Sequence, residues 1–427
     1  MKSVIITPTH NTKYLEETYQ SLLSQTDKDW VWLLIVNGEA LQTNNNFGLS
    51  NVMDSRIIIE KYTETNFIIG AVKKFGFEKA IELGADILIE LDHDDLLTPN
   101  AVEEIKKAFI DPNIGFVYSN YAEFNDVDWS TFHYNHKFGW TYYQEEHNAH
   151  KLDIMNTWNP TPHSIGYIWY APNHVRAWRK SAYINAGMHD PTMKACDDHD
   201  LICRTYFVTT MKVIRKCLYL YRNYKEQSFR VYNKFIQDET RRIHDKYFIK
   251  LARRWAVLNN YKCIDLGAAH HKPYDWIGVD LYNADIKANL NKKWPFKNNS
   301  VGVIRASDIV EHLKDPIHVM NEAYRVLIDG GIFIVYVPSS EGRGSCQDPT
   351  HVSFWNENSF WYYTDPFYSK FVRAIKCKFQ VIRTVTYYPT EFHKLNKIPY
   401  VAVHLSAYKK IRYPGILKWE KAMYEEK

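Results

Sequence analysis

The chain has 427 residues but no long apolar segment, and no run approaches the roughly 20 residues that a membrane-spanning helix needs. Residues 1–25 also lack the pattern of a signal peptide, because the apolar stretch Val4–Ile6 is too short and fits a first strand better. These absences argue against a processive synthase that threads its own polymer through a membrane.

The sequence also lacks C-x-x-C pairs and a strong excess of one sign of charge. The six cysteines form no C-x-x-C pair and several lie in apolar contexts, which is typical of reduced thiols in a cytoplasmic protein. Lys and Arg number 53 and Asp and Glu 49, a net charge of +4 that does not favour nucleic acid as a partner. There is no internal repeat. The length favours two to three domains, and 45% apolar residues can fill two cores.

Strands and helices alternate along the first half. We expect apolar strands at 4–9, 30–36, 57–59 and 87–91, and amphipathic helices at 14–23 and 72–83. This alternation predicts a parallel α/β sheet, which binds ligands at the carboxyl ends of its strands. Thr7, Asn37 and Asp92 fall at such ends.

The segment 87–99, ILIELDHDDLLTP, runs from an apolar strand directly into acidic residues. Asp92 and Asp94 are two positions apart, so on an extended chain both side chains point to one side. Such a pair suits Mg²⁺ or Mn²⁺, which can in turn hold a diphosphate. The alternative is an acidic turn before a helix with Thr98 at its N-cap and Pro99 at its first position.

Three motifs resemble one family in the expected order: ITPTHN at 6–11, NFIIGAVKKFGFEKAIELGADILIELDHDD at 66–95, and GMHDPTMKACDDHDLICR at 187–204. Residues 1–225 are similar to the A-fold, family-2-type glycosyltransferases. The resemblance implies a metal-bound nucleotide-sugar donor, with Asp92 and Asp94 as ligands and Asp95 adjacent. It also places Thr7, Thr9 and Asn37 beside the donor, although the family usually has an acidic pair where this chain has Asn37.

The later acidic motif supplies the general base in that family. Asp197 and Asp198 match it, and Asp198 matches best. Displacement with one base would invert the anomeric centre. The alternative is a solvated acidic helix start over 197–200, with Leu201, Cys203 and Phe207 beginning an apolar face.

The second half predicts another α/β unit with its own core. We expect strands at 263–267, 277–281, 300–304 and 332–337. A helix at 316–327 is opened by Asp315-Pro316 and ended by Gly330-Gly331.

This unit resembles the class I S-adenosylmethionine-dependent methyltransferases over about 260–390. The matching residues are DLG at 265–267, GVD at 278–280, WPF at 294–296, DIVEHL at 308–313 and EAYRVLIDGGIFIVYVPS at 322–339. The resemblance implies that S-adenosyl-L-methionine meets Asp265 and Gly267 at its methionine part, Asp280 at its ribose and Asn289 at its adenine, with Asp308 as a further cofactor-binding residue. One departure is the pair His270-His271, where the family usually has small residues.

In the second half, we expect the methyl acceptor to bind at the segment that follows the strand ending at Pro338. His351, Asp348 and His312 are candidate bases for an acceptor hydroxyl, and we favour His351. Each has a structural alternative in a capped turn or a buried histidine. The aromatic residues of 354–363 offer stacking faces for a sugar ring.

Two segments connect these units and motifs. Helical spacing of apolar residues over 226–258 predicts a helical linker, so we expect domains at 1–225, 259–392 and a C-terminal extension at 393–427. The segment 119–180 is rich in aromatics and histidine, but its spacings match no common zinc pattern. Within it, Trp169 and Trp178 are candidates for sugar stacking or core packing, and Arg176 and Arg179 for phosphate contacts.

Together these features predict two Rossmann-like domains, an A-fold glycosyltransferase followed by a class I methyltransferase. The expected protein is a cytoplasmic bifunctional enzyme that transfers a sugar to a glycan or another hydroxyl acceptor and methylates that product, in surface polysaccharide or glycan biosynthesis. Competing hypotheses are sugar modification of nucleobases in viral DNA and a glycan-binding scaffold with an inactive domain.

Overall fold

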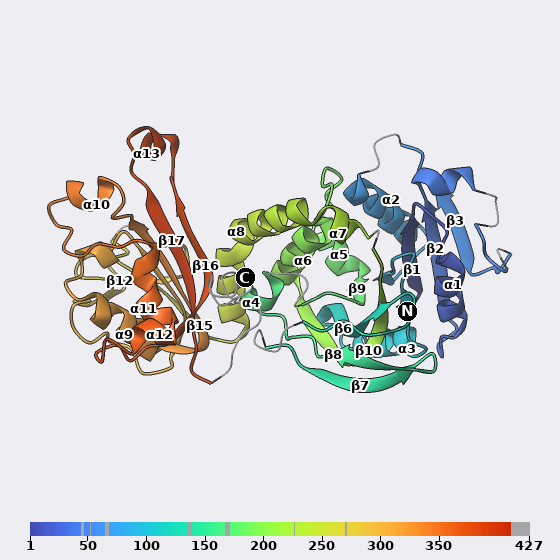
Figure 1. Cartoon of the computed structure of the whole chain (residues 1–427), viewed down its shortest axis with the longest axis horizontal. Coiled ribbons are helices and arrows are strands. Elements are labelled where there is room, and N and C mark those ends of the chain that lie inside the picture. The colour runs from blue at the N-terminus through green and yellow to red at the C-terminus, as the bar shows by residue number, and fades with distance from the viewer. Residues whose placement is uncertain are drawn as a thin grey trace. The chain divides into compact units, whose positions relative to one another are not determined.

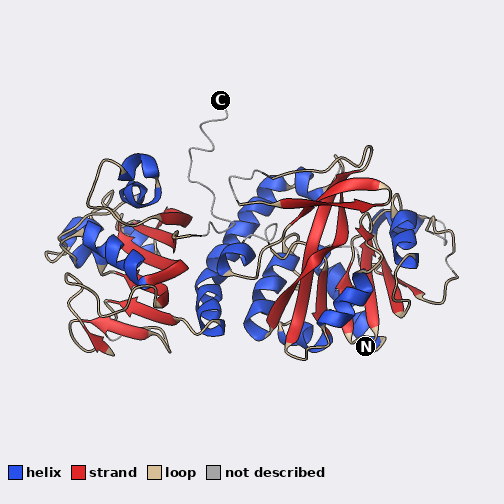
Figure 2. Cartoon of the chain, turned by 90° about the horizontal axis from the view of Figure 1, so that it is seen from below, coloured by secondary structure: helices blue, strands red, loops and turns tan. Residues whose placement is uncertain are grey.

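The computed structural model describes residues 1–43, 47–51, 53–64, 68–134, 139–166, 171–225, 227–269 and 271–410. The chain divides into two compact units, Met1–Leu251 and Ala252–Lys427. Each unit has its own sheet and hydrophobic core (Figures 1 and 2), so the mixed α/β fold class predicted from the sequence is confirmed.

The first unit begins with the alternating strands and helices that the apolar runs predicted. Its elements are β1 Ser3–Thr9, α1 Leu15–Leu23, β2 Trp30–Val36, β3 Ile57–Lys61, α2 Ile69–Glu82, β4 Ile87–Glu90, β5 Leu96–Leu97, α3 Ala101–Ala108, β6 Ile114–Asn125, β7 Tyr142–His147, β8 His150–Met155, α4 Pro162–Ile165, β9 Arg176–Arg179, α5 Lys180–Asn185, α6 Asp197–Val208, β10 Thr210–Asn223, α7 Ser228–Val231 and α8 Asn233–Leu258. The helix α8 runs across the boundary between the two units.

The strand order of the first sheet is β3-β2-β1-β4-β9-β6-β10-β5, with the β7–β8 hairpin paired to β6. Strands β1 to β4 are parallel, whereas β9 is antiparallel to both β4 and β6. The chain moves outward from β1 to β3 and then returns to place β4 on the other side of β1. Ligands of open α/β sheets bind at such a reversal, at the carboxyl ends of the strands. The segments after β1 and β4 are therefore the expected binding edge.

Close packing of α2 on the sheet depends on one small residue. A Cβ on Gly76 would lie 2.8 Å from Ile35 Cγ1 and 2.9 Å from Ile6 Cγ2, so only glycine fits between this helix and strands β1 and β2. Strands β1, β2 and β4 are buried almost throughout and are rich in Val, Ile and Leu, as expected for a parallel sheet covered by helices.

The predicted cap of the helix after Pro99 is wrong. The helix α3 starts at Ala101, and its N-cap residue is Asn100, which makes no side-chain cap hydrogen bond. Thr98 instead donates from Oγ1 to the carbonyl of Cys217 at 3.0 Å, and its amide pairs with Leu218. Thr98 thus extends the pairing between β5 and β10 and does not cap the helix.

The second unit contains a seven-stranded sheet in the order β13-β12-β11-β14-β15-β17-β16. Its elements are β11 Lys262–Leu266, β12 Ile277–Asp280, β13 Ile286–Lys287, β14 Val301–Ser307, α9 Pro316–Val326, β15 Leu327–Pro338, α10 Gly344–Gln347, α11 Trp361–Thr364, α12 Pro366–Ser369, β16 Phe379–Tyr387, α13 Glu391–Leu395 and β17 Tyr400–Ala407. The strand order reverses between β11 and β14, which makes the carboxyl ends of these two strands the expected binding edge.

The helix α9 begins as predicted, because the Asp315 side chain accepts from the amides of Ile317 and His318. Its predicted end is wrong. The helix stops at Val326, and Leu327 is already extended and paired with Val301. Gly330 and Gly331 lie within β15, where the pairing with β14 shifts register. Burial of Leu327 in the core therefore ends the helix before the glycines.

The last strand differs from the expected C-terminal extension. The strand β17 pairs antiparallel with both β15 and β16, and therefore lies inside the sheet rather than beyond it. None of the helices in the described ranges is long and apolar enough to cross a membrane. All six cysteines are free.

Candidate active sites

The first candidate site lies at the carboxyl ends of β1 and β4. Asp92, His93, Asp94 and Asp95 follow β4, and the side chain of Asn11 follows β1. The Asn11 amide nitrogen lies 3.0 Å from His93 Nε2, which joins the two strand ends. The sequence motifs contained Asn11, but its role was missed because this contact joins segments far apart in the chain.

Two of the predicted donor contacts are not available. Thr7 and Thr9 are fully buried. The Thr7 hydroxyl accepts from the Trp32 indole at 2.9 Å, and the Thr9 hydroxyl donates to the carbonyl of Asn11. Both threonines therefore stabilise the strand end instead of facing a ligand. Asn37 directly follows β2 and is also largely buried, with its side-chain amide 3.3 Å from the carbonyl of Ile35.

The acidic loop is anchored by strand β10. The Tyr219 hydroxyl accepts from the amide of Asp92 at 3.2 Å and donates to Asp95 Oδ2 at 2.7 Å. The amide of Arg222 donates to Asp95 Oδ1 at 2.7 Å. Both oxygens of Asp95 are thus held by protein donors, and this side chain fixes the shape of the loop.

Asp94 is held in a different way. Its carbonyl oxygen accepts from Arg222 Nε at 2.7 Å, and its carboxylate accepts from the Tyr224 hydroxyl at 2.8 Å. No other protein donor to this carboxylate is found among the described residues, so it keeps acceptor capacity for a ligand.

Burial strongly affects the other two carboxyls of the loop. It raises the pKa of Asp92 to about 6, and Glu90 and Asp94 add to this effect while Lys73 opposes it. Burial also raises the pKa of Asp95 well above its usual range, with further contributions from Asp94 and Asp92. Several carboxyl groups crowded in a buried loop are costly unless a cation is near. This donor set fits a hard divalent cation.

The predicted base lies in a buried cluster of charges. Asp198, in the first turn of α6, accepts from Arg176 Nη1 at 2.6 Å. The same guanidinium nitrogen lies 3.4 Å from Glu90 Oε2, and Lys73 forms an ion pair with the other Glu90 oxygen. Three elements, α2, β4 and β9, therefore supply the charges that surround Asp198.

The two acidic residues of the base motif have pKa values that are shifted in opposite directions. Burial acts to raise the pKa of Asp198, but Arg176 and Lys73 outweigh it and hold the pKa below its usual range. Burial raises the pKa of Asp197 to about 7, and Asp198 and Glu90 add to this. The side chain of Asp198 is 22% exposed and that of Asp197 only 4%, so Asp198 is the one able to meet an acceptor.

Three further candidates of the insert have structural roles. Trp178 is fully buried and donates from its indole to the Thr205 hydroxyl at 3.1 Å. Arg179 donates to the carbonyls of Ile114 and Phe109, and Arg176 belongs to the charge cluster. Trp169 lies outside the described residues. Sugar stacking by Trp178 and phosphate binding by Arg179 are therefore corrected to core packing.

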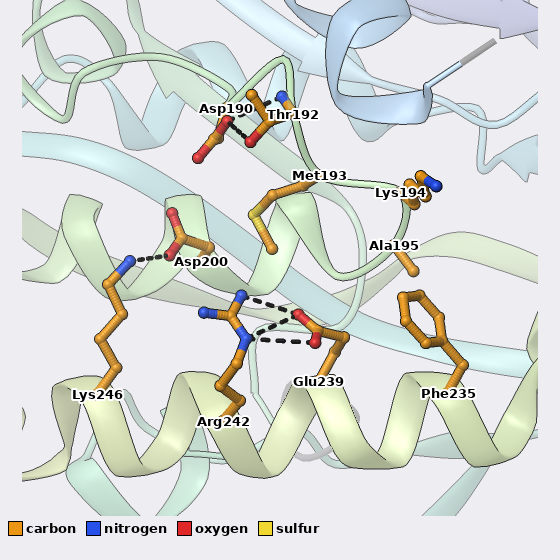
Figure 3. A pocket seen from close by; sticks show the side chains of 10 residues that line it. All are labelled: Asp190, Thr192, Met193, Lys194, Ala195, Asp200, Phe235, Glu239, Arg242 and Lys246. Carbon is orange, nitrogen blue, oxygen red and sulfur yellow. Dashed lines mark hydrogen bonds and ion pairs between the residues drawn. The ribbon is translucent and has the colours of Figure 1, made fainter. Parts of the chain in front are cut away.

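A pocket of about 320 Å³ lies between the segment 190–195 and helix α8 (Figure 3). Four of its charged side chains pair with one another, Arg242 with Glu239 and Lys246 with Asp200. None of the site residues predicted from the sequence lines this pocket, so it is separate from the acidic loop.

The second candidate site lies at the ends of β11, β12 and β14. Gly267, just after β11, has φ +70°, and a Cβ there would lie 2.6 Å from Ile309 Cβ. Asp280 ends β12, and its two oxygens accept from the amides of Leu281 at 2.6 Å and Ala269 at 3.1 Å. The predicted cofactor contacts Gly267 and Asp280 therefore lie on one edge, and the absence of a side chain at Gly267 lets Ile309 pack against it.

The remaining predicted cofactor residues differ in setting. Asp265 is buried, and Arg305 Nη1 lies 3.2 Å from its carboxylate; burial raises the pKa of Asp265 to about 6 against the effect of Arg305. Asp308 follows β14 with φ +53° and accepts from the Ser307 hydroxyl at 3.0 Å. Asn289 is exposed beyond β13 and accepts from the amide of Asn291.

The predicted base His351 has close neighbours. Its Nε2 lies 4.0 Å from both Glu311 Oε1 and Asp348 Oδ2, and its ring centroid lies 4.8 Å from that of His312. Burial raises the pKa of Glu311 to about 8, and Asp308 and Asp348 add to this. The sequence analysis named His351, His312 and Asp348 but missed Glu311, although the DIVEHL motif contains it.

The two folds and their sites define a protein with two transferase domains. Residues 4–173 match the glycosyl transferase family 2 model, and residues 250–335 match a methyltransferase domain model. The chain thus carries a family 2 glycosyltransferase followed by a methyltransferase, as the motifs predicted, and it is an enzyme of both classes.

Comparison with curated proteins gave no match. Among solved structures, TarS 1–349 of S. aureus has a TM-score of 0.40 and 14% identity, covering 64% of this chain and 76% of that chain. The structure of GalNAc-T7 with UDP, GalNAc and Mn²⁺ has a TM-score of 0.40 and 12% identity, covering 53% of this chain and 44% of that chain. The mannosyltransferase PcManGT of Pyrobaculum calidifontis, with GDP-Man and Mn²⁺, has a TM-score of 0.37 and 11% identity, covering 58% of this chain and 64% of that chain.

Proposed function

We propose that the first domain transfers a sugar from a nucleoside diphosphate sugar to a hydroxyl acceptor, with inversion at the anomeric carbon. The observation that carries this proposal is the electrostatic link between loop and base. The buried cations Lys73 and Arg176 act on both Asp92 and Asp198, which supports a shared site for one predicted metal ligand and the predicted base.

In this proposal Asp92 and Asp94 hold Mn²⁺ or Mg²⁺, and Asp95 keeps the loop in shape. The ion supplies charge relief for the leaving diphosphate. Asp198 takes the proton from the acceptor hydroxyl, whose oxygen bonds to the anomeric carbon as the bond to the diphosphate breaks. Arg176 keeps Asp198 ionised and oriented.

The second domain, in this proposal, transfers a methyl group from S-adenosyl-L-methionine to a hydroxyl of the glycan. Gly267 brings the backbone turn after β11 close to the methionine part of the cofactor, Asp280 meets its ribose, and Asp265, Asn289 and Asp308 complete its site. The cofactor supplies an activated methyl group. Free cysteines suit a cytoplasmic enzyme of polysaccharide or glycan biosynthesis.

Aromatic side chains near the second site suggest an order of reactions. In the segment 354–363, Trp355, Phe360 and Tyr363 are core residues, whereas Phe354 and Tyr362 are exposed. Two exposed rings beside the acceptor segment suit a sugar ring. We therefore expect the methyltransferase to prefer the glycosylated product over the bare acceptor.

The proposal is tested by thermal shift and product mass. Nucleotide sugars are screened with and without Mn²⁺ and with S-adenosyl-L-methionine, and hits are incubated with defined acceptors. We expect a metal-dependent shift for one nucleotide sugar, a hexosyl mass increase with inverted configuration by NMR, and then a 14 Da increase. Retained configuration would contradict the assignment of a lone base. Methylation of the bare acceptor at an equal rate would contradict the order.

A further inference from the structure

A second cluster of ligand-type side chains lies in the methyltransferase domain, outside the residues assigned to the cofactor. Glu311 and His312 belong to the short helical turn Val310–His312 after β14, and His351 lies in the segment after α10. One ligand atom from each of the three side chains lies within 4.8 Å of the other two. Two donors on one ion, each about 2.1 Å from it, lie about 3 to 4.2 Å apart, so small side-chain rotations close this cluster.

The carboxylate of Glu311 lacks a partner. The residue is 2% exposed, and neither carboxylate oxygen makes a hydrogen bond in the described structure. No Lys or Arg among the described residues forms an ion pair with it, and His351 Nε2 lies 4.0 Å from its Oε1. A buried carboxylate in this setting calls for a bound cation.

Both histidines present a ring nitrogen to the cluster. His351 Nδ1 lies 2.9 Å from the carbonyl of Ser345, and His312 Nδ1 lies 3.3 Å from the carbonyl of Thr350. A carbonyl oxygen only accepts, so Nδ1 carries the proton in each ring and the neutral imidazole leaves a lone pair on Nε2. Metal-binding histidines are commonly oriented by such a hydrogen bond from the other ring nitrogen.

The backbone holds the two segments together. The carbonyl of Glu311 accepts from the amides of Val352 at 2.8 Å and Ser353 at 3.0 Å, and the Ser353 hydroxyl donates to the carbonyl of Val310 at 2.9 Å. The turn that carries Glu311 and His312 is therefore fixed against the segment that carries His351. A site built on such supports is preorganised for a ligand.

We propose that Glu311, His312 and His351 bind a divalent first-row transition metal ion. Two imidazole nitrogens with one carboxylate suit Mn²⁺, Fe²⁺, Co²⁺ or Zn²⁺ better than Mg²⁺ or Ca²⁺, which prefer oxygen ligands. The ion lies at the carboxyl end of β14, and Asp348 stands beside it. Its role rests on the proposed methyltransferase function: the ion would hold the oxygen of the acceptor hydroxyl, and Asp348, in place of the ligand His351, would take the proton. That oxygen bonds to the methyl carbon as the carbon–sulfur bond of S-adenosyl-L-methionine breaks and S-adenosyl-L-homocysteine leaves.

The experiment uses the full chain carrying Asp94→Ala, which removes the ion expected in the first domain. Cobalt(II) is added, excess metal is removed by gel filtration, and bound metal and visible absorption are measured. We expect about one Co²⁺ per chain with bands of nitrogen ligation. Adding Glu311→Gln or His351→Ala should weaken binding at least about tenfold. The matched control Glu341→Gln, an exposed carboxylate before α10, should retain the ion.

Circular dichroism checks that each variant folds, and His351→Ala decides the matter if Glu311→Gln does not fold. Absence of bound Co²⁺ in the Asp94→Ala protein, or unchanged binding in the cluster variants, overturns the metal site. Methyl transfer at full rate by metal-free wild type overturns the role of the ion. Failure of the wild type to bind S-adenosyl-L-methionine by calorimetry defeats the proposed methyltransferase function instead, while the cobalt measurement still decides the site.

Discussion

Arg176 Nη1 lies 2.6 Å from Asp198 Oδ2, and both side chains belong to the buried charge cluster of the first domain. The guanidinium holds Asp198 ionised, and it also fixes the position of the carboxylate that we propose as the base. A base of lowered pKa works down to lower pH than a free aspartate, although it is a weaker proton acceptor.

Replacing the base tests this directly. Asp198→Asn keeps the shape of the side chain but removes its capacity to accept a proton. We expect donor binding by calorimetry to persist, while turnover falls by about 10² or more. Asp190→Asn, which removes a carboxylate that caps a local turn, should retain activity. A collapse of donor affinity with unchanged turnover would instead make Asp198 a binding residue.

Removing the guanidinium should move the pH profile. In Arg176→Gln the pKa of Asp198 rises, so kcat/KM should begin to fall at a higher pH on the acidic side than in wild type. Loss of one partner from a buried ion pair should also cost about 3–5 kcal/mol of stability. Arg179→Gln, on the same strand but bound to backbone carbonyls, should leave the acidic limb in place. An unshifted limb in Arg176→Gln would show that Asp198 does not control it.

The acidic loop is tested by Asp94→Ala. This change removes a metal ligand but leaves Asp95 and its anchors intact, so the fold should survive with a small change in Tm. Metal-dependent nucleotide binding and sugar transfer should both be lost. Asp128→Asn, an exposed aspartate in a turn, is the matched control. Full transfer in the variant, or in excess chelator, would contradict the metal assignment.

Gly267→Ala tests whether the turn after β11, packed against Ile309, must keep its shape to bind the methyl donor. The added Cβ meets Ile309 and the backbone stays at positive φ, which costs about 1–2 kcal/mol for a residue other than glycine. We expect affinity for S-adenosyl-L-methionine to fall by tenfold or more, measured by calorimetry. Gly84→Ala carries the same conformational cost, since Gly84 has φ +81° with open space around it, and should leave this affinity unchanged. An equal loss of affinity in both variants would mean that backbone strain alone, and not the position of Gly267, lowers the affinity.

Asp280→Ala should stop methylation and leave sugar transfer nearly intact, because each domain has its own core. The change removes the ribose contact and frees the amides of Ala269 and Leu281. Asp280→Asn retains an acceptor for one of these two amides and should recover part of the melting temperature without restoring methylation. Product masses on a defined acceptor give the readout. Loss of sugar transfer in Asp280→Ala would show that the two domains are not independent catalysts.

The sequence predicted local elements well where one interaction dominates. The run Trp30–Val36 became a strand with those bounds, since a continuous apolar segment must be buried on both faces. The acidic loop was found for a similar reason, because its residues are adjacent in the chain and follow a buried strand.

Features that depend on distant segments were missed. Lys73, Glu90 and Arg176 come from three separate elements, and nothing in their local sequence marks them as partners. Thr7 and Thr9 were assigned by position at a strand end, but their side chains turn inward to pair with Trp32 and Asn11. Glu311 was likewise passed over, because its lack of a partner is visible only after folding.

The position of β17 has a consequence for biosynthesis. Tyr400–Ala407 is the last strand among the residues that the structure describes, yet it fills the gap between β15 and β16, which were made earlier. Until the ribosome releases these residues, β15 keeps an unpaired edge and β16 has no neighbour in the sheet, and such open edges recruit other chains. A nascent or truncated chain that stops before Tyr400 should therefore hold a finished glycosyltransferase beside an aggregation-prone partner, and co-translational folding of the second domain must wait for its final strand.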